Sequence, residues 1–245
     1  EQSSLHWQAD RVIEMLRAFA GVDEPFVMFW NPPEPHLPNR VPEPYASMYP
    51  LEAIEPWPGW GDSLTGKPYI QAQQLRSWGV DEWTWDTWRP IVQRYLGEIT
   101  LLDHQIGRVL TALDDLALAD DTLVIYTADH GDMCGSHGMI DKHFIMYDDV
   151  MRVPLILRWP TGKIAANDSF VCTALDLAAT VMDVAGLERP ESFQGVSLCP
   201  NERGEIDTGR SDIFGVYFGN QFGLYSQRMV RDGRYKYVWN ATAED

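Results

Sequence analysis

The chain has 245 residues, 45% of them hydrophobic, and a formal net charge of −17. This hydrophobic content supports a sizeable core, either in one domain or in one domain with a small appendage. The acidic balance argues against nucleic acid as the main partner, because phosphate backbones attract basic surfaces. A small anionic substrate stays compatible with it, since a few local cations or a bound metal can reverse the sign of the field inside one cleft.

The apolar runs are too short and too interrupted to cross a bilayer. The three cysteines, Cys134, Cys172 and Cys199, are widely spaced and form no CxxC pair. That pattern is typical neither of a disulfide framework nor of a zinc ribbon. The sequence indicates no cellular compartment, and it leaves a homo-oligomer open.

The N-terminal part predicts one helix and one strand. Residues 8–20 place apolar side chains on one helical face, and PFVMFWN at 25–31 is a short apolar run typical of a buried strand. A proline-rich loop follows, and the stretch from 50 to 90 has no regular pattern. Six tryptophans of this irregular stretch are expected mostly to cover the core, with a role in substrate specificity as the alternative: Trp57, Trp60, Trp78, Trp83, Trp85 and Trp88.

The central part predicts helices that separate apolar strands. Apolar residues spaced by three and four predict a long helix over 88–116. Strands are predicted at 122–128 and 153–159, and a shorter helix at 176–187 is closed by Gly186. Continuous apolar strands separated by helices are typical of an α/β sheet covered on both faces.

The C-terminal part changes in texture. DIFGVYF at 212–218 and RMVRDGRYKYVW at 228–239 alternate in polarity, and the second contains Asp-Gly, which predicts a β-hairpin. We therefore expect an α/β core over 1–200 and the start of a smaller antiparallel β subdomain over 201–245.

The segment YTADHGDMCGSHGMIDKH, residues 126–143, concentrates groups that can bind metals and anions. Asp129 and His130 directly follow a predicted strand, where ligands of open α/β sheets collect. A carboxylate oxygen beside an imidazole nitrogen provides half of a site for a divalent cation, and Gly131 then permits a tight turn. The alternative is structural: the aspartate caps the turn and pairs with the histidine.

Other residues extend this candidate site. A glycine-containing loop joins Asp129 to Lys142 and His143, and it is long enough to fold back and bring a cation beside the metal. His36 lies in Pro-His-Leu-Pro directly after the first predicted strand, so a loop between prolines positions it. For Asp132 and His137, a place in the site and a role as solvated loop residues stay open as equal alternatives.

Five ordered segments then resemble the sulfatase family of the alkaline phosphatase superfamily. They are PFVMFWNPPEPHLPNRVPEPYASMY, YLGEITLLDHQIGRVLTAL, VIYTADHGDMCGSHGMIDKHFIMYDDVMRVPLILRWP, TALDLAATVMDVAGLERPESFQGVSL and RMVRDGRYKYVWN. Together they cover nearly the whole chain, with 51–90 as the weakest part. The resemblance implies an alkaline-phosphatase-like αβα sandwich, incomplete here, with a small C-terminal antiparallel sheet.

The same resemblance implies roles for the site residues. Asp129 and His130 would ligate one divalent cation, expected to be Ca²⁺, with Mg²⁺ and Mn²⁺ as alternatives. Lys142 would contact the ester oxygens and stabilise the leaving group, and His36 would bind the ester and protonate the leaving group. His143 would bind substrate or support the site. Histidine in the second metal position is similar to the choline-sulfatase and phosphonate monoester hydrolase branches.

One part of the family pattern is missing. Sulfatases form a formylglycine nucleophile from the first residue of C/S-x-P-x-R, near the start of the fold, and this sequence has no such motif. Cys199-Pro-Asn-Glu-Arg203 has its proline one place early and lies near the wrong end of the fold. We therefore expect the chain to correspond to an internal fragment of a sulfatase that is inactive alone.

The sequence thus predicts a sulfuric ester hydrolase, or the relevant part of one, acting on a small sulfate ester. A phosphonate monoester or phosphodiester hydrolase is the alternative within the same superfamily, because the two ester types are similar in size and geometry. A degenerate, non-catalytic anion-binding fragment is the alternative from another class. A pairing of Arg152 with Asp148 or Asp149 is expected to be structural.

Overall fold

The computed structural model describes residues 3–142, 145–160, 164, 171–219 and 225–241. The chain divides into two compact units, each assembled from separate stretches of the sequence. The first comprises residues 1–65, 72–122 and 132–141, and the second comprises 66–71, 123–131 and 142–245. The predicted division at residue 200 remains a prediction.

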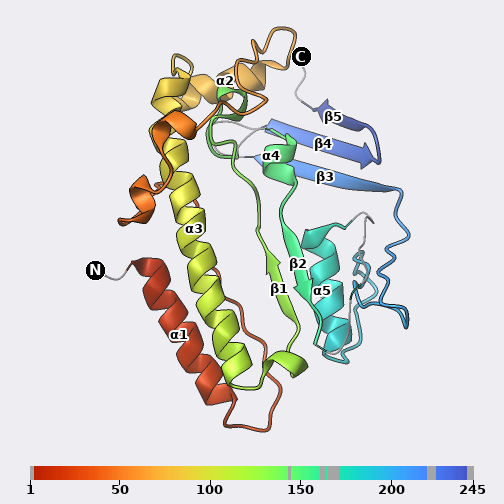
Figure 1. The fold of residues 1–245 in the computed structure, drawn as a ribbon. Helices are drawn as coiled ribbons and strands as arrows, with labels where there is room; N and C mark the ends of the chain where they lie inside the picture. The colour runs from red at the N-terminus through yellow and green to blue at the C-terminus, as the bar shows by residue number, and fades with distance from the viewer. Residues whose placement is uncertain (1–2, 143–144, 161–163, 165–170, 220–224, 242–245) are drawn as a thin grey trace. The chain divides into compact units, whose positions relative to one another are not determined.

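Two parallel helices form the frame of the first unit (Figure 1). Helix α1 (Ser4–Phe19) confirms the N-terminal prediction and starts four residues earlier, where Ser3 Oγ accepts a hydrogen bond from His6 N. Leu5 of α1 packs against Leu101 and Leu102 of α3 (Trp85–Asp115). Further along both helices, Arg108 Nη2 lies 2.6 Å from Asp10 Oδ1, so the two helices run in the same direction.

The long helix α3 confirms the prediction over 88–116. Its buried face, however, only partly follows the apolar residues whose spacing predicted the helix. Ile99 is exposed, whereas Gly97 and Glu98 are buried. A Cβ on Gly97 would lie 2.1 Å from the carbonyl oxygen of Tyr45, so this face accepts the backbone of the short 3₁₀ helix Tyr45–Ser47. Periodicity locates an apolar stripe but not the partner that buries it.

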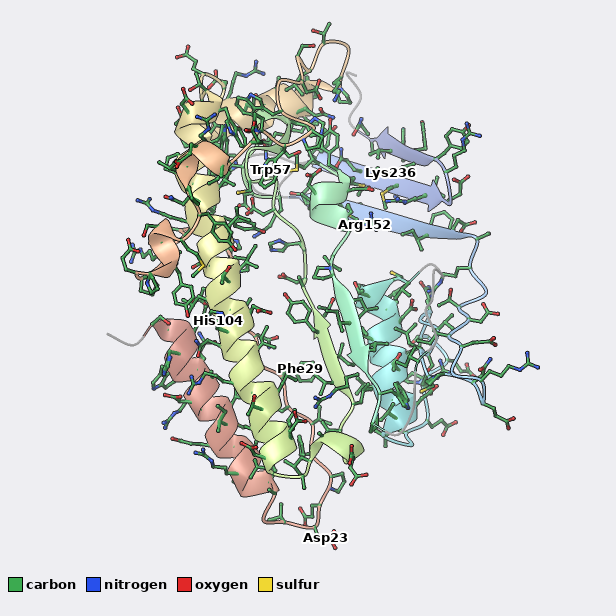
Figure 2. All side chains as sticks on the ribbon, viewed as in Figure 1. Asp23, Phe29, Trp57, His104, Arg152 and Lys236 are labelled. Carbon is green, nitrogen blue, oxygen red and sulfur yellow. The ribbon has the colours of Figure 1, made fainter. Side chains whose placement is uncertain are left out.

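The tryptophan-rich stretch is more ordered than predicted. Helix α2 (Tyr69–Trp78) lies within it, so the expectation of an irregular 50–90 segment is wrong. Trp57 Nε1 donates to Cys134 O at 2.8 Å, and Trp57 lies in a crowded group of side chains (Figure 2). Most of the six tryptophans cover a core cluster, as expected. The buried members of that cluster are Ile54, Val80, Trp85, Trp88, Val92, Cys134 and Ile140.

The predicted strand at 25–31 is wrong. These residues carry no strand assignment, and Val27 and Phe29 are 67% and 77% exposed. An apolar run becomes a strand only where another strand pairs with it. Within the described part of the chain, β pairing is confined to a two-stranded and a three-stranded sheet.

The second unit contains both of these sheets. Strands β1 (Val124–Thr127) and β2 (Leu155–Arg158) confirm two predictions and pair antiparallel, with Thr127 opposite Leu155. Helix α5 (Thr173–Val184) is also confirmed, and it ends before Gly186, whose φ is +66°. The short helix α4 (Asp148–Met151) precedes β2.

A buried carboxylate fixes the chain around α5. Asp176 is fully buried, accepts from Cys172 N and Val196 N, and forms a bidentate pair with Arg210. Gly195 allows the turn to approach, since a Cβ there would lie 2.1 Å from Leu175 O. This packing explains the glycine in the sequence Gln-Gly-Val-Ser-Leu that follows the helix.

The small C-terminal sheet confirms the predicted hairpin. Its strands β3 (Asp212–Gly219), β4 (Tyr225–Asp232) and β5 (Lys236–Asn240) are antiparallel in the order β3-β4-β5. Asp232 Oδ1 accepts from the backbone N–H groups of the turn between β4 and β5. One face buries Tyr225, Gln227 and Met229, and the other exposes Phe214, Val216, Phe218, Tyr237 and Trp239. Among the described residues, no helix is long and apolar enough to cross a membrane.

Candidate active site

Asp129 and His130 lie immediately beyond the end of β1, as predicted. The Asp129 side chain is 88% exposed and that of His130 is 27% exposed. His130 N donates to Asp129 Oδ1 at 3.0 Å, and His130 Nε2 lies 3.6 Å from Asp129 Oδ2. The aspartate therefore stabilises the turn with one oxygen and places the other close to the imidazole. This arrangement is compatible with both the structural and the metal-binding alternative.

The contacts of His130 fix which ring nitrogen carries the proton. Nδ1 lies 2.8 Å from the carbonyl oxygen of Gly131. A carbonyl oxygen only accepts, so Nδ1–H is the donor and, in the neutral ring, Nε2 keeps its lone pair. A metal-ligating histidine typically donates its other N–H in this way. His130 is thus prepared to ligate through Nε2.

The donor set fits two ligands of one divalent cation. A separation of 3.6 Å between Nε2 and Oδ2 suits neighbouring ligands that each lie about 2.0–2.6 Å from a common ion. Over the described residues, no group of three or more His, Cys, Asp or Glu side chains is arranged to hold a metal. The described chain therefore offers a pair of ligands.

Gly131 is required for a different reason than the predicted turn. It is not among the glycines with positive φ, so a left-handed conformation does not explain it. Instead, its N–H donates to Val150 O at 2.8 Å, and a Cβ would lie 1.8 Å from Asp149 O. The backbone after His130 is pressed against α4, and only glycine permits that approach.

Two cations of the C-terminal sheet hold α4. Arg231 Nη1 lies 2.7 Å from Asp148 Oδ2, and Lys236 Nζ lies 2.6 Å from Asp148 Oδ1. Burial alone would raise the pKa of Asp148, but the hydrogen bonds from Lys236 and Arg231 outweigh it and lower the pKa. The predicted pairing with Arg152 is wrong for Asp148, because a short helix cannot reveal partners some 80 residues away.

The loop after Gly131 folds back on itself, as predicted. Met133 N donates to Asp141 O at 3.0 Å, and Gly135 N donates to Met139 O at 2.8 Å. Lys142, which is partly buried, directly follows Asp141. Its role at the ester stays a prediction. His143 lies outside the described residues.

Asp132 and His137 are not solvated loop residues, so that alternative is excluded for both. His137 Nδ1 lies 2.7 Å from Asp62 Oδ2, with both side chains about four-fifths buried. Asp132 Oδ1 accepts from Cys134 N at 2.8 Å, and burial raises the pKa of this carboxyl group. His137 connects the loop to Asp62, 75 positions away, whereas Asp132 accepts from a backbone N–H within the loop itself.

His36 occupies an exposed loop with a fixed backbone. Its N–H donates to Pro33 O at 3.0 Å, and its Nδ1 lies 2.9 Å from Leu37 O. By the same reasoning as for His130, Nδ1–H is the donor, and the neutral ring keeps its lone pair on Nε2. His36 belongs to the first unit and the Asp129–His130 pair to the second. The structure shows the side chains of Asp129 and His130 next to each other. For His36 it shows only the contacts within the first unit.

A buried carboxylate that the sequence did not reveal anchors the His36 loop. Asn39 Nδ2 donates to Pro35 O at 3.0 Å and to Glu98 Oε2 at 2.7 Å. Glu98, on α3, is 3% exposed. Burial raises its pKa to about 7, against the hydrogen bond from Asn39, and the nearby charge of Glu34 adds to the rise. The only sequence signal was an acidic residue within an apolar helical face.

The sequence is similar to that of known sulfatases. A family model described as Sulfatase matches residues 6–187, and one described as N-sulphoglucosamine sulphohydrolase, C-terminal, matches residues 135–244. The uncharacterized sulfatase YidJ of Escherichia coli is 36% identical over 196 residues, which cover 79% of this chain and 38% of that protein. The N-acetylglucosamine-6-O-sulfatase of Bacteroides thetaiotaomicron is 34% identical over 67% of this chain and 26% of its own length.

Solved structures agree with these relatives. The phosphonate monoester hydrolase of Silicibacter pomeroyi has a TM-score of 0.79 at 25% identity and covers 98% of this chain and 52% of its own. That of Agrobacterium radiobacter has a TM-score of 0.77 at 27% identity, with coverages of 96% and 52%. The alkaline-phosphatase-like fold is thereby confirmed. The chain spans between a quarter and about half of the length of these proteins.

Proposed function

The chain belongs to the sulfatase family, and we propose on this premise that its protein is a sulfuric ester hydrolase that uses one divalent cation. The observation that carries the proposal is the pair Asp129 and His130, with Nε2 of the histidine and Oδ2 of the aspartate 3.6 Å apart. Ca²⁺ is the proposed ion. Mg²⁺ and Mn²⁺ remain alternatives, because Asp129 and His130 supply only part of a coordination shell, and the choice of ion depends on all of its ligands.

The residues of the chain divide the chemistry between binding and proton transfer. Asp129 and His130 would hold the cation, which polarises the ester oxygens when bound. Lys142 would neutralise charge on those oxygens and on the leaving group, as a point charge does for phosphate and sulfate. Because Nδ1–H of His36 is held by Leu37 O, His36 would protonate a leaving group from Nε2 as the imidazolium ion.

The nucleophile is a separate component of the proposal. The printed sequence holds no C/S-x-P-x-R motif. A formylglycine elsewhere in the protein would split one difficult displacement into two easier steps. His143 is proposed as a substrate contact from its place next to Lys142. Ester turnover by the complete gene product distinguishes this hydrolase from an anion-binding protein without catalysis.

A second function has support from the solved structures. Two phosphonate monoester hydrolases match nearly all of the chain, with TM-scores of 0.79 and 0.77. Phosphonate monoesters and phosphodiesters resemble sulfate esters in charge and shape, so the same cation and lysine would serve either. The sequence relatives named as sulfatases at 36% and 34% identity favour the sulfate ester.

The test compares esters on the complete gene product. We expect turnover of 4-nitrophenyl sulfate to exceed that of 4-nitrophenyl phenylphosphonate, to disappear with a chelator and to return with Ca²⁺. His130→Ala and Asp129→Asn are expected to lower kcat/KM on the order of 100-fold, since each removes a ligand of the ion. Asp120→Asn removes an exposed carboxylate before β1 and is the control.

The outcomes separate the alternatives. Dominant turnover of the phosphonate would transfer the assignment to the second function. Turnover of neither ester by the complete protein would favour a non-catalytic anion-binding role. Activity that survives both the chelator and the His130→Ala change would remove the metal from the proposal.

A further inference from the structure

Helix α4 contacts Gly131, which directly follows the candidate metal pair, on one side and the C-terminal sheet on the other, and all of these groups belong to the second unit. On the first side, Gly131 N donates to Val150 O at 2.8 Å, and the Gly131 Cα is so close to Asp149 O that no Cβ fits. The carbonyl of the same Gly131 receives the Nδ1–H of His130. The orientation of the imidazole therefore depends on where α4 lies.

On the second side, α4 is tied to the sheet by charge and by packing. The Asp148 carboxylate receives Arg231 of β4 on one oxygen and Lys236 of β5 on the other, at 2.7 and 2.6 Å. A Cβ on Gly215 of β3 would lie 3.2 Å from the terminal methyl group of Met151, so α4 also packs closely on the sheet. All three strands thus contribute to the position of this helix.

Lys236 extends the connection to the backbone before α4. Its Nζ also donates to Met146 O at 2.8 Å, and Met146 is buried. Met146 lies four residues after Lys142, the proposed anion-binding lysine. One ammonium group therefore holds both the carboxylate at the start of α4 and the chain that leads to it from Lys142.

We propose that Asp148 is a positioning residue for the metal pair: through Arg231 and Lys236 it fixes α4 against the C-terminal sheet, and α4 in turn fixes Gly131 and the His130 imidazole. The inference rests on the proposed function, because it assumes that His130 ligates a cation. It assigns the C-terminal sheet a part in the geometry of the metal pair.

A simple surface ion pair would not have this effect. The Asp148, Arg231 and Lys236 side chains are 42%, 33% and 24% exposed, so their contribution to global stability is small. The ion pairs contribute little free energy, but they restrict the position of α4, because two cations on different strands contact the same carboxylate. Without that carboxylate the two cations repel each other, and α4 loses its polar attachment to both strands.

The experiment measures cation binding directly on the complete gene product. Calorimetric titrations with Ca²⁺, Mg²⁺ and Mn²⁺ identify the ion that the wild type binds best. We expect Asp148→Asn to raise the Kd for that ion on the order of tenfold, within the range known for residues that orient metal ligands. Asp148→Glu, which keeps the charge, should stay within about threefold of the wild type.

Asp149→Asn is the matched control. It removes the same charge from the neighbouring residue, whose side chain is exposed. It should leave the Kd unchanged. Lys236→Met, which leaves Arg231 on Asp148, should give an intermediate rise and decides the question if Asp148→Asn does not fold. An equal Kd in Asp148→Asn and Asp149→Asn, or in Lys236→Met and wild type, overturns the proposal, as does a wild type that binds none of the three ions.

Turnover of 4-nitrophenyl sulfate and 4-nitrophenyl phenylphosphonate is measured on the same samples. A wild type that binds the ion but hydrolyses neither ester contradicts the proposed function while leaving the Kd comparison valid. Intact hydrolysis with an unchanged Kd in Asp148→Asn contradicts the positioning role alone. The two failures are therefore distinguishable.

Discussion

The loop that carries His36 and the loop that carries His130 orient their imidazoles alike but are held in place differently. Each histidine donates Nδ1–H to the carbonyl oxygen of the next residue, at 2.9 Å in His36 and 2.8 Å in His130. The His36 loop is held by a hydrogen bond between the Asn39 amide and the buried Glu98 carboxyl group. The His130 loop is held by a close backbone approach to α4, which a partly exposed ionic cluster attaches to the C-terminal sheet.

Because the two loops are supported differently, they should respond to different changes in conditions or sequence. A buried carboxyl group with a pKa of about 7 changes charge near neutral pH, so the support of the His36 loop is sensitive to pH. A contact that excludes a single Cβ is sensitive to side-chain volume, and a partly exposed ion pair is sensitive to salt. The following changes test this assignment.

Gly131→Ala is expected to have the largest effect. The added Cβ would lie 1.8 Å from Asp149 O, a backbone atom that moves only if α4 moves. We expect a loss of about 3 kcal/mol in the free energy of unfolding, measured by urea denaturation, together with weaker cation binding.

The control for this change is Gly107→Ala in α3, where no atom lies within 4 Å of the added Cβ. Since alanine favours a helix, this variant should be stabilised by about 0.5–1 kcal/mol. Equal stability of the two variants would contradict the close approach at Gly131.

Glu98→Gln should change the pH dependence of stability. The pKa of Glu98 rises from 4.5 to about 7 on folding, so its contribution to stability is complete below about pH 4.5 and is lost as the pH rises to about 7. Glutamine keeps an acceptor for Asn39 without the charge. The variant should therefore be the more stable protein at pH 8, by up to about 3 kcal/mol.

Thermal melting from pH 4 to pH 8 measures this effect. The wild-type Tm should fall between about pH 4.5 and 7 relative to that of Glu98→Gln. Glu82→Gln, which removes an exposed carboxylate just before α3, should run parallel to the wild type. Parallel curves for Glu98→Gln would show that Glu98 titrates alike in the folded and unfolded states.

Asp148→Asn should have the smallest effect on global stability. Its partners are partly exposed, so we expect a loss of less than about 1 kcal/mol at low salt and a smaller one at 1 M NaCl. Because the pKa of Asp148 is lowered, this contribution exists above the unfolded pKa and disappears as the pH falls through the folded one. A larger loss that salt does not reduce would mean that packing holds α4.

The sequence was most reliable where a pattern is local. The helices α1, α3 and α5, the strands β1 and β2 and the C-terminal hairpin follow from periodicity and turn residues, and the structure confirms each. The strand at 25–31 failed because pairing is not a local property, and α2 was missed inside a tryptophan-rich stretch without clear periodicity. Asp129 and His130 were predicted from their place after β1.

The sequence alone therefore determined the family, the local elements and the types of ligand available, because these depend on residue identity and spacing. Only the tertiary structure decided what supports those ligands. The contact of Gly131 with α4, the cations of β4 and β5 on Asp148, and the burial of Glu98 behind Asn39 join residues between about 20 and 90 positions apart. Such partners are selected by packing, and no local pattern encodes them.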